Sequence, residues 1–194
     1  MGASFSYSPS YDYSYASYEP AVTITERVVD SGTPAGFTSP DSAEADRLFD
    51  DGRYSEAAEM YRQLSFAHES DVFVRLAHAH CLLADGRYEY AAYVVRKAAG
   101  LDPDWEQIFM QLRGHYGDWG IYVDQVTELE QYIAEKPDNT AARFLLGYAY
   151  LFWDRYGDAA GVFRSLLARQ PEDNGVRYFL GTTESLEKRG EASS

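Results

Sequence analysis

The chain has 194 residues and a formal net charge of −14, from 17 basic and 31 acidic side chains. Hydrophobic residues make up 45% of it, which is enough to form a buried core. The acidic excess argues against a nucleic-acid partner and against an anionic membrane surface, because both attract basic side chains.

Residues 1–38 differ in composition from the rest of the chain. Five tyrosines alternate mainly with serines there, and three prolines interrupt the stretch: Tyr7, Tyr11, Tyr13, Tyr15, Tyr18, Pro9, Pro20 and Pro34. Residues 21–29 alternate like a short strand but have no second strand to pair with. We predict a flexible or extended Tyr/Ser-rich tail, whose tyrosines would gain from contact with a surface.

A helical pattern begins near Ser39, which suits an N-cap, with Pro40 at the first helical position. Glycine-containing turns then divide the chain at regular intervals. The pattern predicts paired helices and a final single one, over 41–51 and 54–67, 71–85 and 88–101, 104–116 and 121–135, 138–153 and 156–169, and 173–188. Residues 190–194 are expected to form a disordered end.

The most informative feature is a period of 34 residues. Four tyrosines follow it, Tyr54, Tyr88, Tyr122 and Tyr156, and so do Pro103, Pro137 and Pro171. Two residues before each tyrosine stand Gly52, Gly86, Gly120 and then Asp154. A fixed period of this length is typical of stacked helical repeats.

The unit resembles a tetratricopeptide repeat (TPR). In residues 143–171, Leu146-Gly147 and Tyr150 match the first helix of the family, and Tyr156, Ala159, Phe163 and Pro171 match the second helix and its end. The resemblance covers about residues 39–189. It implies an all-α, right-handed superhelical stack of about four helix pairs plus a C-terminal capping helix.

Two parts of the array depart from the family pattern. In the third unit Arg113 and Gln125 replace the small residues at which paired helices meet, so we expect wider spacing or a one-residue register shift there. The final helix becomes polar at Glu184, Glu187 and Lys188, as a cap on an exposed end requires. A fragment of a longer array stays open as the alternative.

The resemblance also implies a function. First helices of TPR units line a concave groove for peptides, and the matching positions here are mainly apolar and aromatic: Phe73, Leu76, His80, Leu83, Gln107, Met110, Gly114, Phe144, Tyr148, Leu151, Phe152 and Tyr178. We therefore expect a protein–protein interaction scaffold that binds an apolar or aromatic segment, with Phe144, Tyr148 and Phe152 as anchors.

Three other interpretations of these positions stay open. The groove residues could simply pack within the array. The Tyr-rich tail could fold back and fill the groove in cis, which would make the protein autoinhibited. Alternatively, the tail of one copy could dock on another, giving a structural self-assembly module.

We find no residue constellation that predicts catalysis, a metal or a cofactor. His78 and Cys81 are three residues apart and share a helix face, but two ligands do not make a zinc site. Neither a phosphate-binding glycine loop nor a Gly-x-Ser-x-Gly nucleophile motif occurs. No apolar run is long enough to cross a membrane, and a single cysteine fits a reducing compartment. We expect a cytoplasmic, non-enzymatic protein, with a mature exported fragment as the alternative.

Overall fold

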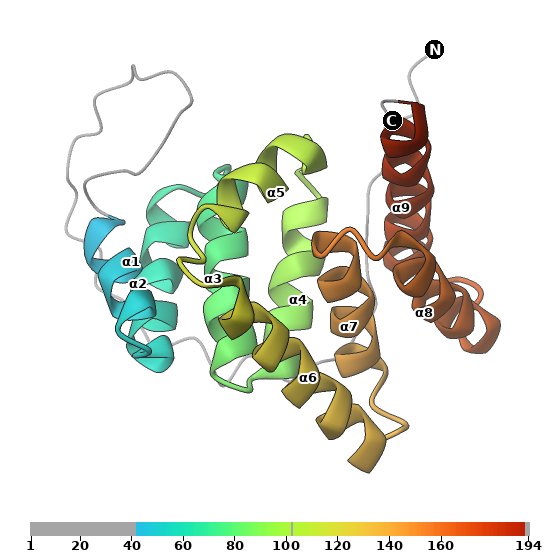
Figure 1. Ribbon diagram of the computed structural model, residues 1–194, viewed down its shortest axis with the longest axis horizontal. Helices are drawn as coiled ribbons and strands as arrows, with labels where there is room; N and C mark the ends of the chain where they lie inside the picture. Colours follow the sequence, from blue (N-terminus) through green and yellow to red (C-terminus); the bar gives the residue numbers. More distant parts are fainter. Residues whose placement is uncertain (1–41, 102, 193–194) are drawn as a thin grey trace. The chain divides into compact units, whose positions relative to one another are not determined.

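The computed structural model describes residues 42–101 and 103–192. These residues form nine α-helices and no β-strand (Figure 1). The helices are α1 (Ala43–Asp50), α2 (Tyr54–Ala67), α3 (Val72–Ala84), α4 (Tyr88–Ala99), α5 (Trp105–Arg113), α6 (Trp119–Glu135), α7 (Thr140–Phe152), α8 (Tyr156–Arg169) and α9 (Asn174–Ala192). The predicted all-α fold is confirmed. Eight of the helices begin and end within a few residues of their predicted bounds.

The end of the chain differs from the prediction. Helix α9 continues to Ala192, so residues 190–192 are helical. Lys188, Arg189, Glu191 and Ala192 are good helix formers. The predicted tail over residues 1–38 lies outside the described residues.

The turns between paired helices recur with the period of 34 residues. Gly52 (φ 73°), Gly86 (φ 71°) and Asp154 (φ 57°) all adopt a left-handed backbone conformation just after a first helix. Gly120 breaks this rule, because it lies in the first turn of α6 and accompanies a different cap, in which its N–H bonds to Asp118 Oδ1 (2.8 Å). The third unit therefore has the glycine and tyrosine of the repeat sequence but not the turn conformation of the other units.

Most of the chain stacks in sequence order. Helix α1 packs on α2, α2 on α3 and α3 on α4. In the same way α7 packs on α8 and α8 on α9. Within the α7–α8 pair, Gly147 lets the ring of Phe163 approach closely, since a Cβ at this position would lie 2.6 Å from that ring. Close approach at Gly147 is what the TPR pattern predicts, although the side chain that comes nearest is that of Phe163 and not the small Ala159.

The third pair leaves the stack, which goes beyond the wider spacing or register shift expected from the sequence. Helix α4 packs directly against α7, and α5 and α6 are not packed along each other. Instead α5 lies against α3, and α6 lies against α7 and α3 (Figure 1). We call the segment from Trp105 to Glu135 the crossover hairpin.

Side-chain contacts show why a crossover is needed. In the first turn of α4, Glu89 accepts a hydrogen bond from Asn139, the N-cap residue of α7. Arg96 lies two turns after Glu89 in α4, and Phe144 lies more than one turn after Asn139 in α7. The guanidinium of Arg96 lies over the ring of Phe144, 3.8 Å from the ring centre. The two helices therefore run in the same direction, whereas helices joined by short turns run in opposite directions. Helices α5 and α6 carry the chain from the end of α4 back to the start of α7.

Two glycine substitutions test the close packing of α7 on α8. Gly147→Ala is expected to lower the free energy of unfolding by about 1–2 kcal/mol, because overpacking against the buried Phe163 outweighs the better helix propensity of alanine. Gly161→Ala is the matched control in α8, where a Cβ meets nothing within 4 Å, and it should stabilise by about 0.5–1 kcal/mol. Urea denaturation measures both, and equal stabilisation in the two variants would refute the close approach.

Candidate protein-interaction surface

Helices α3 and α7 present an aromatic face built around His80. Its ring is buried, with Nδ1 2.8 Å from Tyr116 Oη and Nε2 3.0 Å from Tyr148 Oη. The ring of Phe152 packs edge-on against it at 4.6 Å. We call the rings on and over this face the central aromatic cluster: His80, Tyr148 and Phe152, with Trp105, Phe109, Tyr116, Trp119 and Tyr122 from the crossover hairpin.

Both ring nitrogens of His80 are hydrogen-bonded. Nδ1 bonds to the hydroxyl of Tyr116, which also contacts Gln125 Oε1 (3.3 Å). Nε2 bonds to the hydroxyl of Tyr148. Burial lowers the pKa of His80 to about 3, so the ring is neutral near pH 7 and every one of its polar atoms is bonded.

Helix α5 covers this face with two aromatic anchors. The ring of Trp105 contacts those of Tyr148 and Phe179, and the ring of Phe109 contacts those of Tyr148 and Phe152. Trp105 Nε1–H donates to Tyr178 Oη at 2.9 Å. Because both anchors are buried, the face is occupied by a segment of the same chain.

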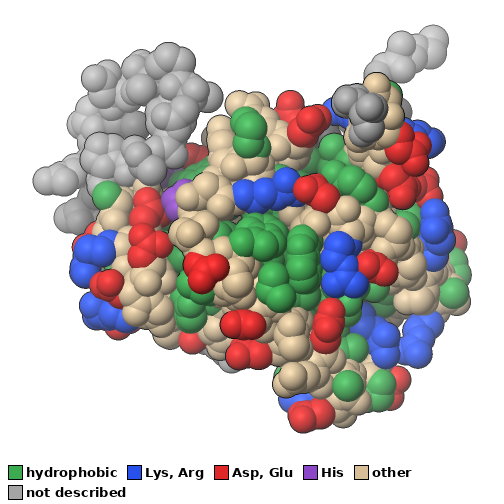
Figure 2. Space-filling model, in the orientation of Figure 1, with side chains coloured by type: hydrophobic (Ala, Val, Ile, Leu, Met, Phe, Trp, Pro, Cys, Tyr) green, Lys and Arg blue, Asp and Glu red, His purple; other side chains and the backbone are tan. Residues whose placement is uncertain are grey.

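Helix α6 covers the part of the face next to the end of α7. Its residues Trp119 and Tyr122 both contact Phe152, and the hydroxyl of Tyr122 donates to the carbonyl of Ala149 (2.9 Å). Figure 2 shows hydrophobic side chains gathered between α5 and α6, with charged side chains at the edges of this region.

The two unusual residues of the third unit hold the crossover hairpin in place. Arg113 donates from Nε and Nη2 to the carbonyl of Phe152 (3.1 and 2.6 Å) and pairs with Asp154 (2.6 Å). Gln125 is buried and accepts from Tyr116, while its Nε2 has no protein partner. A small residue at either position could not make these bonds.

The structure places the predicted groove residues in different environments. The following are buried: Phe73, Leu76, His80, Leu83, Phe144, Tyr148, Leu151 and Phe152. Tyr178 is half-buried and bonded to Trp105, and Met110 is 68% exposed on the outward side of α5. Most of the candidates thus pack within the array, and α5 covers Tyr148 and Phe152 in particular.

Sequence reasoning missed Trp105, Phe109, Trp119 and Arg113 as parts of this surface. The available signal was the third unit itself, where Arg113 and Gln125 replace the small contact residues of the family. The predicted docking of the N-terminal tail, and the self-assembly it would allow, concern residues 1–38 and lie outside the described residues.

A second contact fastens α4 to the α7–α9 part of the array. Arg96 makes a two-bond ion pair with Asp173 (3.0 and 3.1 Å) while its guanidinium lies over the ring of Phe144. Asp173 also accepts the N–H of Val176, as an N-cap of α9 does (3.0 Å). Gly175 makes room for the arginine, because a Cβ there would lie 2.4 Å from Nη1.

Asp173→Ala should lower the free energy of unfolding by about 2–3 kcal/mol, because it removes the cap and leaves a largely buried guanidinium unpaired. Asp173→Asn should cost less, since the amide oxygen still caps α9. Thermal unfolding of the two variants measures the difference. A loss below about 0.5 kcal/mol for the alanine variant would mean that the α4–α9 contact is not formed.

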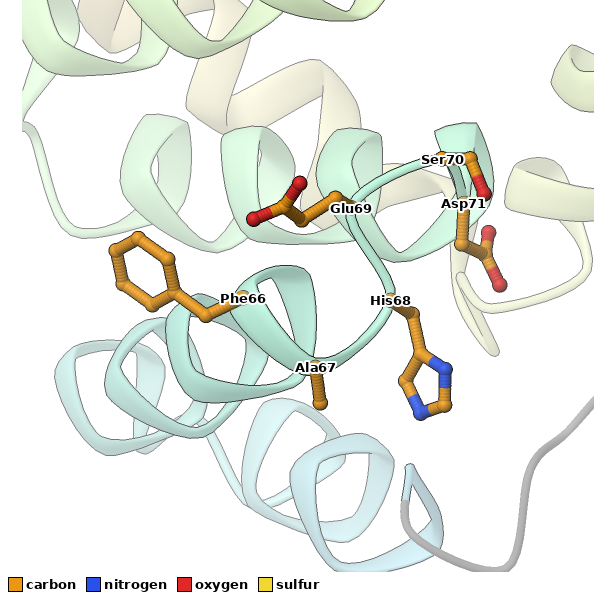
Figure 3. A pocket seen from close by; sticks show the side chains of 6 residues that line it. All are labelled: Phe66, Ala67, His68, Glu69, Ser70 and Asp71. Atoms are coloured by element: carbon orange, nitrogen blue, oxygen red, sulfur yellow. The ribbon is translucent and has the colours of Figure 1, made fainter. Parts of the chain in front are cut away.

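The surface also has an open depression of about 730 Å³ at the turn between α2 and α3. Phe66, Ala67, His68, Glu69, Ser70 and Asp71 line it, and Figure 3 shows these side chains pointing in several directions. They do not converge on a common point, as groups that hold a small ligand must.

The described residues contain no group of three or more His, Cys, Asp or Glu side chains placed to hold a metal ion. No helix among them is both long and apolar enough to cross a membrane.

Comparisons with known proteins agree with this division of the chain. A family model described as tetratricopeptide repeat matches residues 42–104 and 126–174, more than half of the chain. The unmatched stretch between them contains α5 and the start of α6. No curated protein matches the chain.

Solved structures similar to this chain include two of MamA. One, from AMB-1, is 22% identical, with 79% of this chain and 91% of that chain covered and a TM-score of 0.34. The other, a point mutant of MamA, is 23% identical, with coverage of 77% and 82% and a TM-score of 0.33. At these scores the likeness carries no argument about function. The family match and the helix pairs together establish that the chain belongs to the tetratricopeptide repeat family.

Proposed function

We propose that the chain is a non-enzymatic protein–protein interaction scaffold that binds an apolar or aromatic segment at the face of α3, α7 and α9. TPR proteins are interaction scaffolds as a family. The observation that carries the proposal is that this face already seats a helix, α5, through the aromatic anchors Trp105 and Phe109. A surface that holds one amphipathic helix in this way has the shape and chemistry to hold another.

The chemistry of the interior supports a binding role over a catalytic one. Burial lowers the pKa of both His78 and His80 to about 3, so neither is poised to exchange protons near neutral pH. Burial also raises the pKa of the Cys81 thiol well above its usual range, which makes it a poor nucleophile. The polar groups around His80 bond one another instead of facing a substrate cleft.

The charge of the chain narrows the class of partner. The net charge of −14 favours a basic or neutral protein segment and disfavours nucleic acid. The co-chaperone members of the family hold a C-terminal carboxylate with basic side chains. Such a clamp is absent from the candidate positions, so we expect the partner to be held through apolar side chains.

Photocrosslinking tests the proposal. A photoreactive phenylalanine replaces Tyr178, which is half-buried on α9 at the edge of this face, and in a control protein it replaces Phe66, which is 54% exposed on α2. In cells that make the protein, position 178 should give a discrete protein adduct and position 66 should not. Equal labelling at both positions, or no adduct at position 178, would contradict the proposed surface.

A further inference from the structure

We propose that α5 is an internal ligand of the α3–α7–α9 face, and that the partner is an amphipathic helix of the same chemistry. That helix carries aromatic residues at positions i and i+4, an aliphatic residue at i+7 and an arginine at i+8. The inference rests on the proposed function and names the class of segment that the face binds. It follows from the residues by which α5 is held.

Helix α5 has the pattern of a groove-bound helix. Trp105, Phe109 and Leu112 lie at i, i+4 and i+7 on one side, and all three are buried. Glu106, Gln107 and Met110 lie on the other side and are exposed. The buried side contacts rings of α7 and α9, including Tyr148, Phe152 and Phe179.

Polar contacts at both ends set the position of α5 on the face. At its start, Trp105 Nε1–H donates to Tyr178 Oη of α9 (2.9 Å). At its end, Arg113 donates twice to the carbonyl of Phe152, the last residue of α7, and pairs with Asp154. Carbonyls at the end of a helix lack partners within that helix, so a ligand with a cation at this position satisfies one of them.

The fold allows α5 to leave without breaking the array. Helix α4 packs directly on α7, so the stack is continuous without α5. Helix α5 has only nine residues, and Gly100 precedes it while Gly114 and Gly117 follow it. These short segments tether α5 at both ends, so it can lift from the face and return.

Tethering also makes α5 a strong competitor for its own site. An intramolecular ligand acts at a high effective concentration, so a free helix of equal chemistry binds the intact chain weakly. The intact chain binds through the fraction of molecules in which α5 has left the face. Affinity should therefore rise when α5 is disabled.

A synthetic peptide of residues 103–117 tests the inference against the full chain. Two variants vacate the face: the double substitution Trp105→Ser with Phe109→Ser, and a chain in which a Gly/Ser linker replaces residues 105–113. Fluorescence anisotropy of the labelled peptide should show binding to either vacated variant at least about tenfold tighter than to the unaltered chain. A peptide with serine in place of both aromatic residues should not bind, and one with glutamine in place of the arginine should bind more weakly.

Each other outcome overturns the inference. A vacated variant that keeps its helical circular dichroism and cooperative unfolding but does not bind the peptide shows that the face is not a helix site. If neither variant folds, α5 is an inseparable part of the core. If the unaltered chain is dimeric by light scattering and the linker variant is monomeric, the occupant is a second copy. In each of these cases an adduct at position 178 in the crosslinking experiment would show that a partner still contacts the α9 edge of the face, so the proposed function fails only if that adduct is absent.

Discussion

Replacing Tyr148 with alanine is expected to lower the free energy of unfolding by about 3–5 kcal/mol. Its side chain is 1% exposed and contacts the rings of Trp105, Phe109 and Phe179. Its hydroxyl is also hydrogen-bonded to the buried Nε2 of His80. The substitution leaves a large cavity and an unpaired nitrogen, and both are costly in a close-packed core.

One milder variant separates the contributions of the ring and the hydroxyl of Tyr148, and a second serves as a control. Tyr148→Phe keeps the ring and should cost about 1–2 kcal/mol, because only the bond to His80 is lost. Met110→Ala, on the exposed side of α5, should change stability by less than about 0.5 kcal/mol. Chemical denaturation at pH 7 measures all three. The sequence prediction treated Tyr148 as a partner anchor, and a folded Tyr148→Ala variant of unchanged stability would favour that role over the structural one.

Acidification from pH 7 to pH 5 is expected to lower the free energy of unfolding by up to about 4 kcal/mol. The pKa of His78 and His80 is about 3 in the folded chain, mainly through burial, and about 6.5 for an exposed histidine. The unfolded chain thus binds more protons between these values. The stability is fully present above about pH 6.5 and is lost as the pH falls toward 3, by about 2 kcal/mol for each histidine at pH 5.

A single substitution checks the assignment. His78 packs edge-on against Tyr90 and makes no hydrogen bond through its ring among the described contacts, so His78→Phe keeps an aromatic ring there. It should reduce the loss between pH 7 and 5 by about half. Carboxyl groups contribute at lower pH, as with Glu59, whose pKa the bond to Arg62 lowers to about 2. An unchanged pH dependence in His78→Phe would contradict the assignment.

Most of the helices and the turns between them could be predicted from the repeat period. The turns before Tyr54, Tyr88 and Tyr156 each contain a left-handed residue, Gly52, Gly86 and Asp154, because such a residue is needed where two helices meet at a short turn. Such local requirements repeat in every regular unit, and a period detects them. The stacking order of the helices could not be predicted from the sequence in the same way, since it depends on which helix surfaces meet and not on the turns alone.

The packing of the third unit could not be predicted from the sequence. Arg113 and Gln125 marked it as irregular, but nothing in the spacing indicated that Arg113 would bond to Phe152 and Asp154, 39 and 41 residues away. The groove residues were assigned as if the array were continuous. Two of them, Tyr148 and Phe152, instead contact rings of α5, and Phe152 also contacts α6, because α4 and α7 lie side by side and the crossover hairpin lies on the aromatic face of α3 and α7.

The central claim is that α4 packs directly on α7 and that the third pair crosses over them. A chain with Cys81→Ala, Glu89→Cys and Asn139→Cys tests it with a short thiol-to-thiol crosslinker, since the side chains at 89 and 139 are bonded to each other. A second chain with Glu89→Cys and Gln111→Cys reports a regular stack, in which the end of α5 would lie beside the start of α4. We predict efficient crosslinking of 89 to 139 and little of 89 to 111. The reverse result would contradict the crossover.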